Sequence, residues 1–149
     1  MTLEQKELLL KDLCARLPYG IKFPITVRNP ITSEPIETTG TISYINRYGI
    51  VSFVWDYEGQ EILVKDSLHI KDVKPYLFPI SSMTEEQKRE YNSLRNFVPT
   101  YHYEFGDIVE DTELYDNFES IDYLIANHFD YRGLIPLGLA IDATSKNIY

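Results

Sequence analysis

The chain has 149 residues, of which 44% are hydrophobic and 25% are charged, and this composition is typical of a single globular domain. The formal net charge of −9 is concentrated in residues 80–149, which hold 13 acidic and 5 basic residues. No Lys or Arg lies between Arg95 and Arg132. An acidic stretch of this kind is the strongest compositional signal in the chain.

The cysteine count and the charge pattern narrow the class of protein further. The single cysteine, Cys14, excludes an intramolecular disulfide and a cysteine-based metal site. The longest stretch without Asp, Glu, Lys or Arg is Pro75–Thr84, far shorter than the roughly 20 residues of a membrane helix. The first residues carry charges where a signal peptide would be apolar. We therefore expect a cytoplasmic, soluble protein that has no contact with a membrane.

The N-terminal residues predict a helix over residues 3–16. Thr2 and Gln5 form a capping-box pattern at its start, and Pro18 and Gly20 end it. We expect its buried face to include Cys14, as a small apolar side chain. The apolar residues assigned to this face are Leu3, Leu10, Leu13, Cys14 and Leu17.

From Ile21 the hydrophobic period changes from 3.6 to 2, which predicts a strand over residues 21–28. Pro24 within it indicates an edge position or a bulge. Tight turns are expected around Tyr48 and Gly59. The further strands are expected at residues 38–46, 50–57, 61–65 and 69–73. About five short strands predict a small antiparallel β-barrel, SH3-like in preference to OB-like, with an open, curled sheet as the alternative.

The remaining residues predict helices that pack on the barrel. Thr84 and Gln87 repeat the capping-box pattern ahead of a helix over residues 85–96. Asp116 and Glu119 form another possible cap, ahead of a helix over residues 117–128, whereas residues 100–115 are acidic and aromatic without a clear period. The fold class is therefore α+β. Its two parts are residues 1–79, a helix plus a small barrel, and residues 80–149, an acidic helical segment.

Residues 128–135, HFDYRGLI, place an imidazole, a carboxylate, a phenol and a guanidinium close together. Catalysis would need a nucleophile within hydrogen-bond reach of His128, and neighbours in sequence do not supply that geometry. We interpret His128 as a helix end and Asp130 as the cap of a short following helix, with Gly138 at its left-handed end. Arg132 would pair with Asp130 or with the acidic stretch. The alternative is partner binding, through Tyr131 and Arg132; no catalytic residue is predicted.

Three segments carry a family resemblance: residues 11–20 (KDLCARLPYG), residues 74–86 (KPYLFPISSMTEE) and residues 128–135. Together they resemble a family of short uncharacterised proteins encoded in Bacteroidetes genomes, often in prophage or other mobile-element neighbourhoods. Pro136 and Leu137 stand where that family commonly has Glu and Lys. The resemblance implies a small intracellular accessory protein and no particular activity.

Four closely spaced acidic residues could bind a cation or a partner: Asp107, Glu110, Asp111 and Glu113. They lack the alternating acidic order of a calcium loop, and the chain has no paired Cys or His-x-x-x-His for zinc. We therefore predict no metal and no cofactor. An acidic surface of this kind either serves solubility or binds a basic protein.

A nucleic-acid interface is the alternative function. Small barrels bind nucleic acid through exposed aromatic rings that are surrounded by basic residues, and Trp55 and Tyr57 are the candidate rings. However, residues 20–79 hold 7 acidic and 6 basic residues, so the barrel is nearly neutral. The leading hypothesis is a non-enzymatic accessory module that binds another protein through its acidic, aromatic C-terminal surface. The residues assigned to that surface are Tyr131, Arg132, Asp107, Glu110, Asp111 and Glu113.

Overall fold

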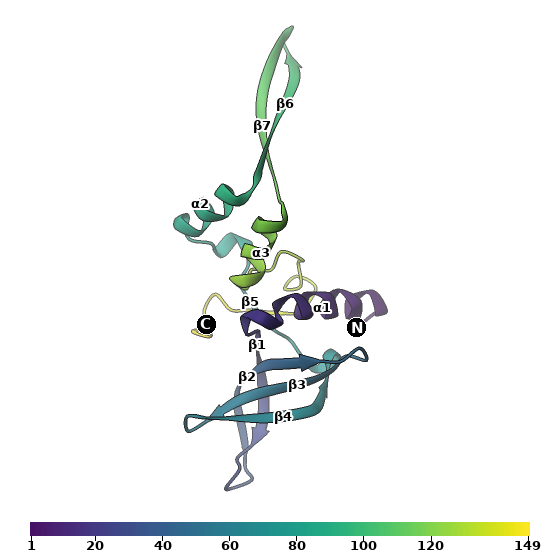
Figure 1. Ribbon diagram of the computed structural model, residues 1–149, viewed down its shortest axis with the longest axis vertical. Helices are drawn as coiled ribbons and strands as arrows, with labels where there is room; N and C mark the ends of the chain where they lie inside the picture. The colour runs from purple at the N-terminus through teal and green to yellow at the C-terminus, as the bar shows by residue number, and fades with distance from the viewer.

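A computed structural model describes residues 1–149 and shows an elongated α+β protein (Figure 1). A four-stranded antiparallel sheet lies at one end, and a two-stranded hairpin projects from the other (Figure 1). Helices and the C-terminal segment lie between them (Figure 1). The chain therefore presents two separate β-structures, one at each end of its long axis.

Helix α1 (Leu3–Arg16) begins at the predicted capping box, in which the Gln5 backbone N–H donates to the Thr2 hydroxyl at 3.2 Å. The predicted burial of Cys14 is wrong, because this side chain is exposed. The helix instead buries Leu9, Leu13 and Arg16, which recur at intervals of about one turn on a single face. A short 3-10 turn, η1 (Leu17–Tyr19), follows and ends at Gly20, whose φ of +71° favours glycine.

The main sheet has the strand order β1-β2-β3-β4, with every neighbouring pair antiparallel. Its strands are β1 (Lys22–Arg28), β2 (Pro35–Ile45), β3 (Ile50–Tyr57) and β4 (Gln60–His69). The edge position that Pro24 indicated is confirmed, because β1 pairs only with β2. A proline can lie there because its missing N–H removes no hydrogen bond between strands.

The fifth predicted strand does not form. Residues Ile70–Asp72 make a 3-10 turn, η2, and the chain then leaves the sheet. Both β1 and β4 consequently remain edge strands, and the four strands form an open sheet in place of the predicted closed barrel. Hydrophobic period alone could not distinguish a fifth strand from a short apolar turn of the same length.

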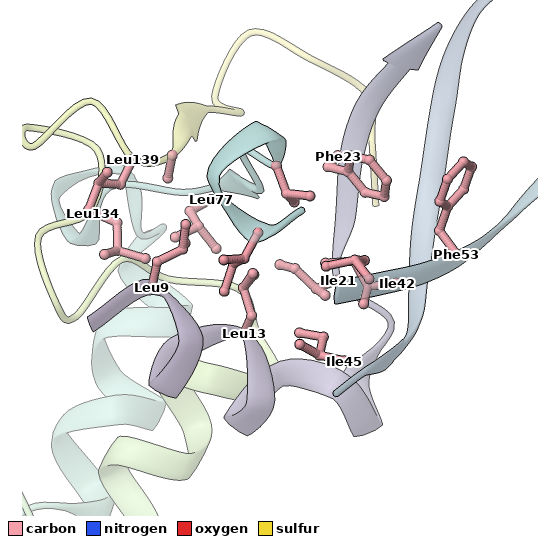
Figure 2. Packing of buried hydrophobic residues seen from close by; sticks show 14 of the residues in the cluster. Leu9, Leu13, Ile21, Phe23, Ile42, Ile45, Phe53, Leu77, Leu134 and Leu139 are labelled. Atoms are coloured by element: carbon pink, nitrogen blue, oxygen red, sulfur yellow. The ribbon is translucent and has the colours of Figure 1, made fainter. Parts of the chain in front are cut away.

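The main core lies between α1, the sheet and the C-terminal segment (Figure 2). Leu13 of α1 points toward Ile21 of the sheet region, Leu9 lies beside Leu77 and Leu134, and all of these side chains are buried. Phe23 and Phe53 make an edge-to-face pair with 5.4 Å between ring centroids. Gly40 lies against this pair, and a Cβ there would meet the Phe23 ring at 3.0 Å. The glycine therefore allows the two rings to pack directly on β2.

The C-terminal part is held to the body by a short parallel pair, β5 (Tyr76–Leu77) with β8 (Ile141–Asp142). A 3-10 turn, η3 (Ile80–Ser82), precedes α2 (Glu85–Leu94), which begins at the predicted capping box of Thr84 and Gln87. Helix α3 (Phe118–Ala126) is capped by Asn117 and Ser120, one residue later than the predicted pair. A second, smaller core joins Met83, Leu124 and Phe129.

The helical segment is interrupted by a hairpin that the sequence did not indicate. Strand β6 (Asn96–Glu104) pairs with β7 (Asp107–Tyr115) in continuous register, from Asn96 opposite Tyr115 to Glu104 opposite Asp107. Phe105 and Gly106 form the two-residue turn, and both have positive φ, as this kind of hairpin requires. We call residues 96–115 the arm. The arm leaves α2 and α3 and extends away from the rest of the molecule (Figure 1).

Candidate functional site

The arm has two chemically different faces. Residues opposite each other in an antiparallel pair point to the same side, and successive residues alternate between sides. One side, which we call the aromatic face, carries Phe97, Pro99, Tyr101, Tyr103, Ile108, Glu110, Thr112 and Leu114. The other side, the acidic face, carries Asn96, Val98, Thr100, His102, Glu104, Asp107, Val109, Asp111, Glu113 and Tyr115.

The rings of the aromatic face lie open to solvent. The exposed fraction is 67% for Phe97, 66% for Tyr101 and 80% for Tyr103, and Phe105 at the tip is fully exposed. A contiguous apolar row of this kind marks an interaction site more often than a feature of the folded monomer. The arm is also only two strands wide, and such a hairpin is at best marginally stable without further packing.

The four carboxylates that the sequence grouped together are divided between the two faces. Asp107, Asp111 and Glu113 lie on the acidic face, whereas Glu110 lies among the rings of the aromatic face, opposite Tyr101. No group of three or more His, Cys, Asp or Glu side chains is arranged to hold a metal ion. The strand pairing therefore makes Glu110 the only charged residue of the aromatic face.

Arg95 fixes the base of the arm to the helices. Its Nη2 donates to the Leu114 carbonyl at 2.6 Å, and its Nε lies 3.2 Å from Asp116 Oδ1. The guanidinium also stacks over the Tyr91 ring of α2, 5.3 Å from its centroid. These contacts bind β7 to the end of α2, so the arm leaves the body in a defined direction.

The predicted cluster in residues 128–135 is organised around a buried ion pair that the sequence did not indicate. Arg16 Nε lies 2.7 Å from Asp12 Oδ2, and neither side chain is exposed. Arg16 also donates to the backbone carbonyls of Ile125, at 3.2 Å, and Phe129, at 2.7 Å. Arg132 lies 3.5 Å from Asp12 Oδ1, so its predicted pairing with Asp130 or with the acidic stretch is wrong. The Arg16 guanidinium of α1 therefore anchors the C-terminal end of α3 through these hydrogen bonds.

His128 follows α3 directly and adopts a left-handed conformation with a φ of +60°. Its ring stacks on Tyr149 with 3.8 Å between centroids, and its buried Nδ1 has no hydrogen-bond partner. Burial, together with the nearby charges of Arg16 and Lys22, lowers the pKa of His128 to about 4, although the Tyr19 carbonyl partly opposes this. The imidazole is therefore neutral near pH 7. Its observed contacts are with an aromatic ring and positive charges, and no hydroxyl or thiol is hydrogen-bonded to it.

Asp130 caps a turn and not the short helix that the sequence predicted. Its two carboxylate oxygens accept hydrogen bonds from the backbone N–H groups of Leu134, at 2.7 Å, and Ile135, at 2.8 Å. The chain then continues through turns to Gly138, which is left-handed as expected, with a φ of +70°. Only turns follow because residues 131–140 include two glycines and a proline, which disfavour a helix.

Tyr131 is half-buried and packs against the smaller core. The guanidinium carbons of Arg132 and Arg16 lie 4.6 Å and 5.9 Å from its ring centroid. Its burial raises the pKa of the phenol, an effect that the two arginines partly offset. The partner-binding residues predicted in this segment therefore lie apart from the arm and contact α1.

The aromatic residues predicted for nucleic-acid binding belong to the sheet core. Trp55 is 5% exposed and packs edge-on against Tyr57, with 5.7 Å between ring centroids. Trp55 also lines a cavity of about 420 Å³ that opens between the two edge strands, and we call this cavity the slot. Its lining includes Val27 and Arg28 of β1, Phe53 and Trp55 of β3, and Val64 and Leu68 of β4.

Comparisons of the chain with protein-family models, with curated proteins and with solved structures find no match. None of its helices is long and apolar enough to cross a membrane. The exposed rings of the arm and the apolar slot are therefore the features that indicate a function.

Proposed function

We propose that this chain is a non-enzymatic protein-binding module and that its contact surface is the aromatic face of the arm. The observation that carries the proposal is the row of exposed rings at Phe97, Tyr101 and Tyr103, continued by Phe105 at the tip. Aromatic residues are enriched at protein interfaces because each buries a large area at little cost in conformational entropy.

The shape of the arm restricts the surface that can receive it. Nine residues per strand give a length of roughly 30 Å and two strands give a width of roughly 10 Å, so one face offers about 300 Å². A stable interface buries about 800 Å² on each partner. A flat contact with the aromatic face is therefore too small by itself, so its rings must enter an apolar pocket of the partner while other surfaces of the two proteins add contact area.

The acidic face favours a protein over nucleic acid as the partner. Asp107, Asp111 and Glu113 would repel phosphates, and no Lys or Arg lies on either strand of the arm. Outside such a pocket these carboxylates would remain in water or contact basic residues at its rim. The family resemblance described above implies a cytoplasmic accessory protein of a phage or mobile element. A protein-binding module agrees with that role. Tyr131 and Arg132 would then support α1 and remain outside the contact.

The test is capture of partners from a lysate of the source cells at low salt, with the full chain as bait. The variant Tyr103→Ser/Phe105→Ser removes two exposed rings and should lose the partners that the wild-type chain retains. The matched control is Ile31→Ser, which removes an exposed apolar side chain from the β1–β2 connection. Equal capture by the wild-type chain and the arm variant would contradict the proposal.

The alternative, nucleic-acid binding by the aromatic residues of the open sheet, has a separate test. Trp55 is the only tryptophan, so its fluorescence reports on the slot directly. Quenching by single-stranded or duplex oligonucleotides at low salt would support the alternative. We expect no quenching, because Trp55 is buried and Arg28 is the only charged residue that lines the slot.

A further inference from the structure

The rings of the arm need an apolar pocket, and the structure contains one at the opposite end of the molecule. We propose that the slot of a second copy of this chain receives rings of the aromatic face, so that the protein assembles with itself head to tail. This inference rests on the proposed function, since it names the partner of the aromatic face.

The slot is lined by residues of both edge strands and of β3. Strands β1 and β4 border it, and neither has a second neighbour in the sheet. The backbone groups on the outer side of an edge strand are free to pair with an added strand. Pro24 weakens the β1 edge, whereas β4 contains no proline and offers ten consecutive residues. An incoming strand would extend the sheet at the β4 edge.

The chemistry of the slot matches that of the aromatic face. Phe53, Trp55 and Val64 give the slot apolar walls, and its volume of about 420 Å³ is in the range of cavities that enclose small organic ligands. Aromatic side chains of the arm can therefore enter it. Bound in this way, the rings would lose contact with water while the acidic face of the arm stayed outside.

One charge on each surface completes the match. Arg28 is the only charged residue that lines the slot, and Glu110 is the only charged residue of the aromatic face. Neither forms an ion pair within the chain, and Arg28 is held by a 3.2 Å hydrogen bond from its Nη1 to the Ser33 carbonyl. An ion pair between Glu110 of one copy and Arg28 of the next would fix the depth to which the arm enters.

The positions of the two surfaces require separate copies. The arm and the sheet project from opposite ends of the elongated molecule, so a chain cannot place its arm in its own slot (Figure 1). The contact joins two different surfaces and leaves one arm and one slot free in every open assembly. Such heterologous contacts produce rings when the rotation closes and filaments when it does not.

The test measures the mass of the full-length chain by sedimentation velocity over a range of concentrations. The wild-type mass should rise above 17.4 kDa with concentration. Arg28→Glu and Glu110→Arg should each weaken association by about tenfold or more, because each places like charges together. In the double variant, Arg28→Glu/Glu110→Arg, opposite charges face each other again in every contact, with their positions exchanged. This variant should therefore recover association. Two controls, Arg47→Glu and Glu113→Arg, make the same charge changes outside the slot and on the acidic face and should behave as wild type.

A mixing experiment tests the direction of the contact. Tyr103→Ser/Phe105→Ser has an intact slot and a defective arm, and Arg28→Glu has the reverse. Each should be monomeric alone, and the mixture should form a 1:1 dimer and nothing larger. Both sets of substitutions lie at exposed positions, so circular dichroism should show unchanged folding.

The outcomes separate this inference from the proposed function. A wild-type chain that stays monomeric at every concentration overturns self-assembly, and the function stands if the arm variant still loses partners captured from the lysate. Self-association that Arg28→Glu leaves unchanged also overturns the role of the slot. Self-association that persists without Tyr103 and Phe105 overturns the role of the arm in self-assembly, whereas the proposed function is overturned only by equal lysate capture with the wild-type chain and the arm variant.

Discussion

Asp12 and Arg16 form a fully buried ion pair on α1, with 2.7 Å between Arg16 Nε and Asp12 Oδ2. The pair connects the N-terminal helix to the end of α3, because Arg16 also donates to the carbonyls of Ile125 and Phe129. Arg132 approaches the same carboxylate from the C-terminal segment. Two parts of the chain that are distant in sequence, residues 12–16 and 125–132, therefore depend on one buried guanidinium and one buried carboxylate.

Replacing Arg16 with Met should lower the free energy of unfolding by about 3–5 kcal/mol, because Asp12 would remain buried with only the more distant Arg132 as a partner. Urea denaturation followed by circular dichroism measures the change. Lys11→Met is the matched control on an exposed position of the same helix, and it should change stability by less than about 0.5 kcal/mol. Similar effects for the two variants would show that the pair has no such role.

Asp130→Ala should destabilise the protein by about 1–3 kcal/mol, because the N–H groups of Leu134 and Ile135 would lose their acceptors. Asp130→Asn keeps one carbonyl oxygen and should cause a smaller loss. Thermal or urea unfolding of both variants measures the difference. An alanine variant as stable as wild type would indicate that water or another group replaces the carboxylate.

The stability of the protein should fall as the pH falls from about 6.5 toward about 4. The pKa of His128 is lowered from 6.5 to about 4 in the folded state, so between these values the unfolded chain binds the proton and the folded chain does not. Proton uptake therefore favours unfolding in this window, and below it the contribution of His128 becomes constant. The charges that face the imidazole are Arg16 of α1 and Lys22 of β1.

The variant His128→Asn isolates this effect, because asparagine tolerates the left-handed backbone at position 128. Urea unfolding of both proteins at several pH values between 7 and 4 should show a steeper loss for the wild type. The carboxylates titrate in both proteins and cancel in the comparison. Parallel pH profiles would mean that His128 is not protonated on unfolding in this range.

Arg95→Ala should loosen the base of the arm without unfolding the body. The substitution removes the hydrogen bond to the Leu114 carbonyl and the ion pair with Asp116. Hydrogen exchange measured by mass spectrometry should become faster in residues 96–115 and remain unchanged in β2 and β3. Arg89→Ala, on an exposed position of α2, is the control. Unchanged exchange in the arm would contradict the anchoring role of Arg95.

The local elements were largely predictable because their signals lie within a few residues of one another. The capping boxes at Thr2 and Thr84 correctly marked the starts of α1 and α2, and Pro24 marked an edge strand. The alternation that predicted β1 follows from burial of one face of that strand. Capping and alternation depend on the conformation of neighbouring residues. Tertiary contacts therefore do not change the elements that they predict.

The arm escaped prediction although its residues alternate. Phe97, Tyr101 and Tyr103 share one face, but a proline, a histidine and scattered carboxylates obscure the pattern in a single strand. The two faces become visible only when the register with β7 is known. The same register places Glu110 on the aromatic face and Asp111 and Glu113 on the acidic face.

Local sequence signals were enough to place the three helices, the four strands of the main sheet, the caps at Thr2 and Thr84 and the concentration of negative charge. Only the tertiary structure decided that the fifth strand is missing, that Asp12 and Arg16 are buried together, and that the arm and the slot lie at opposite ends (Figure 1). The physical reason is that propensity and capping depend on neighbouring residues. Burial, ion pairing and edge exposure depend on contacts between residues as far apart as Arg16 and Phe129.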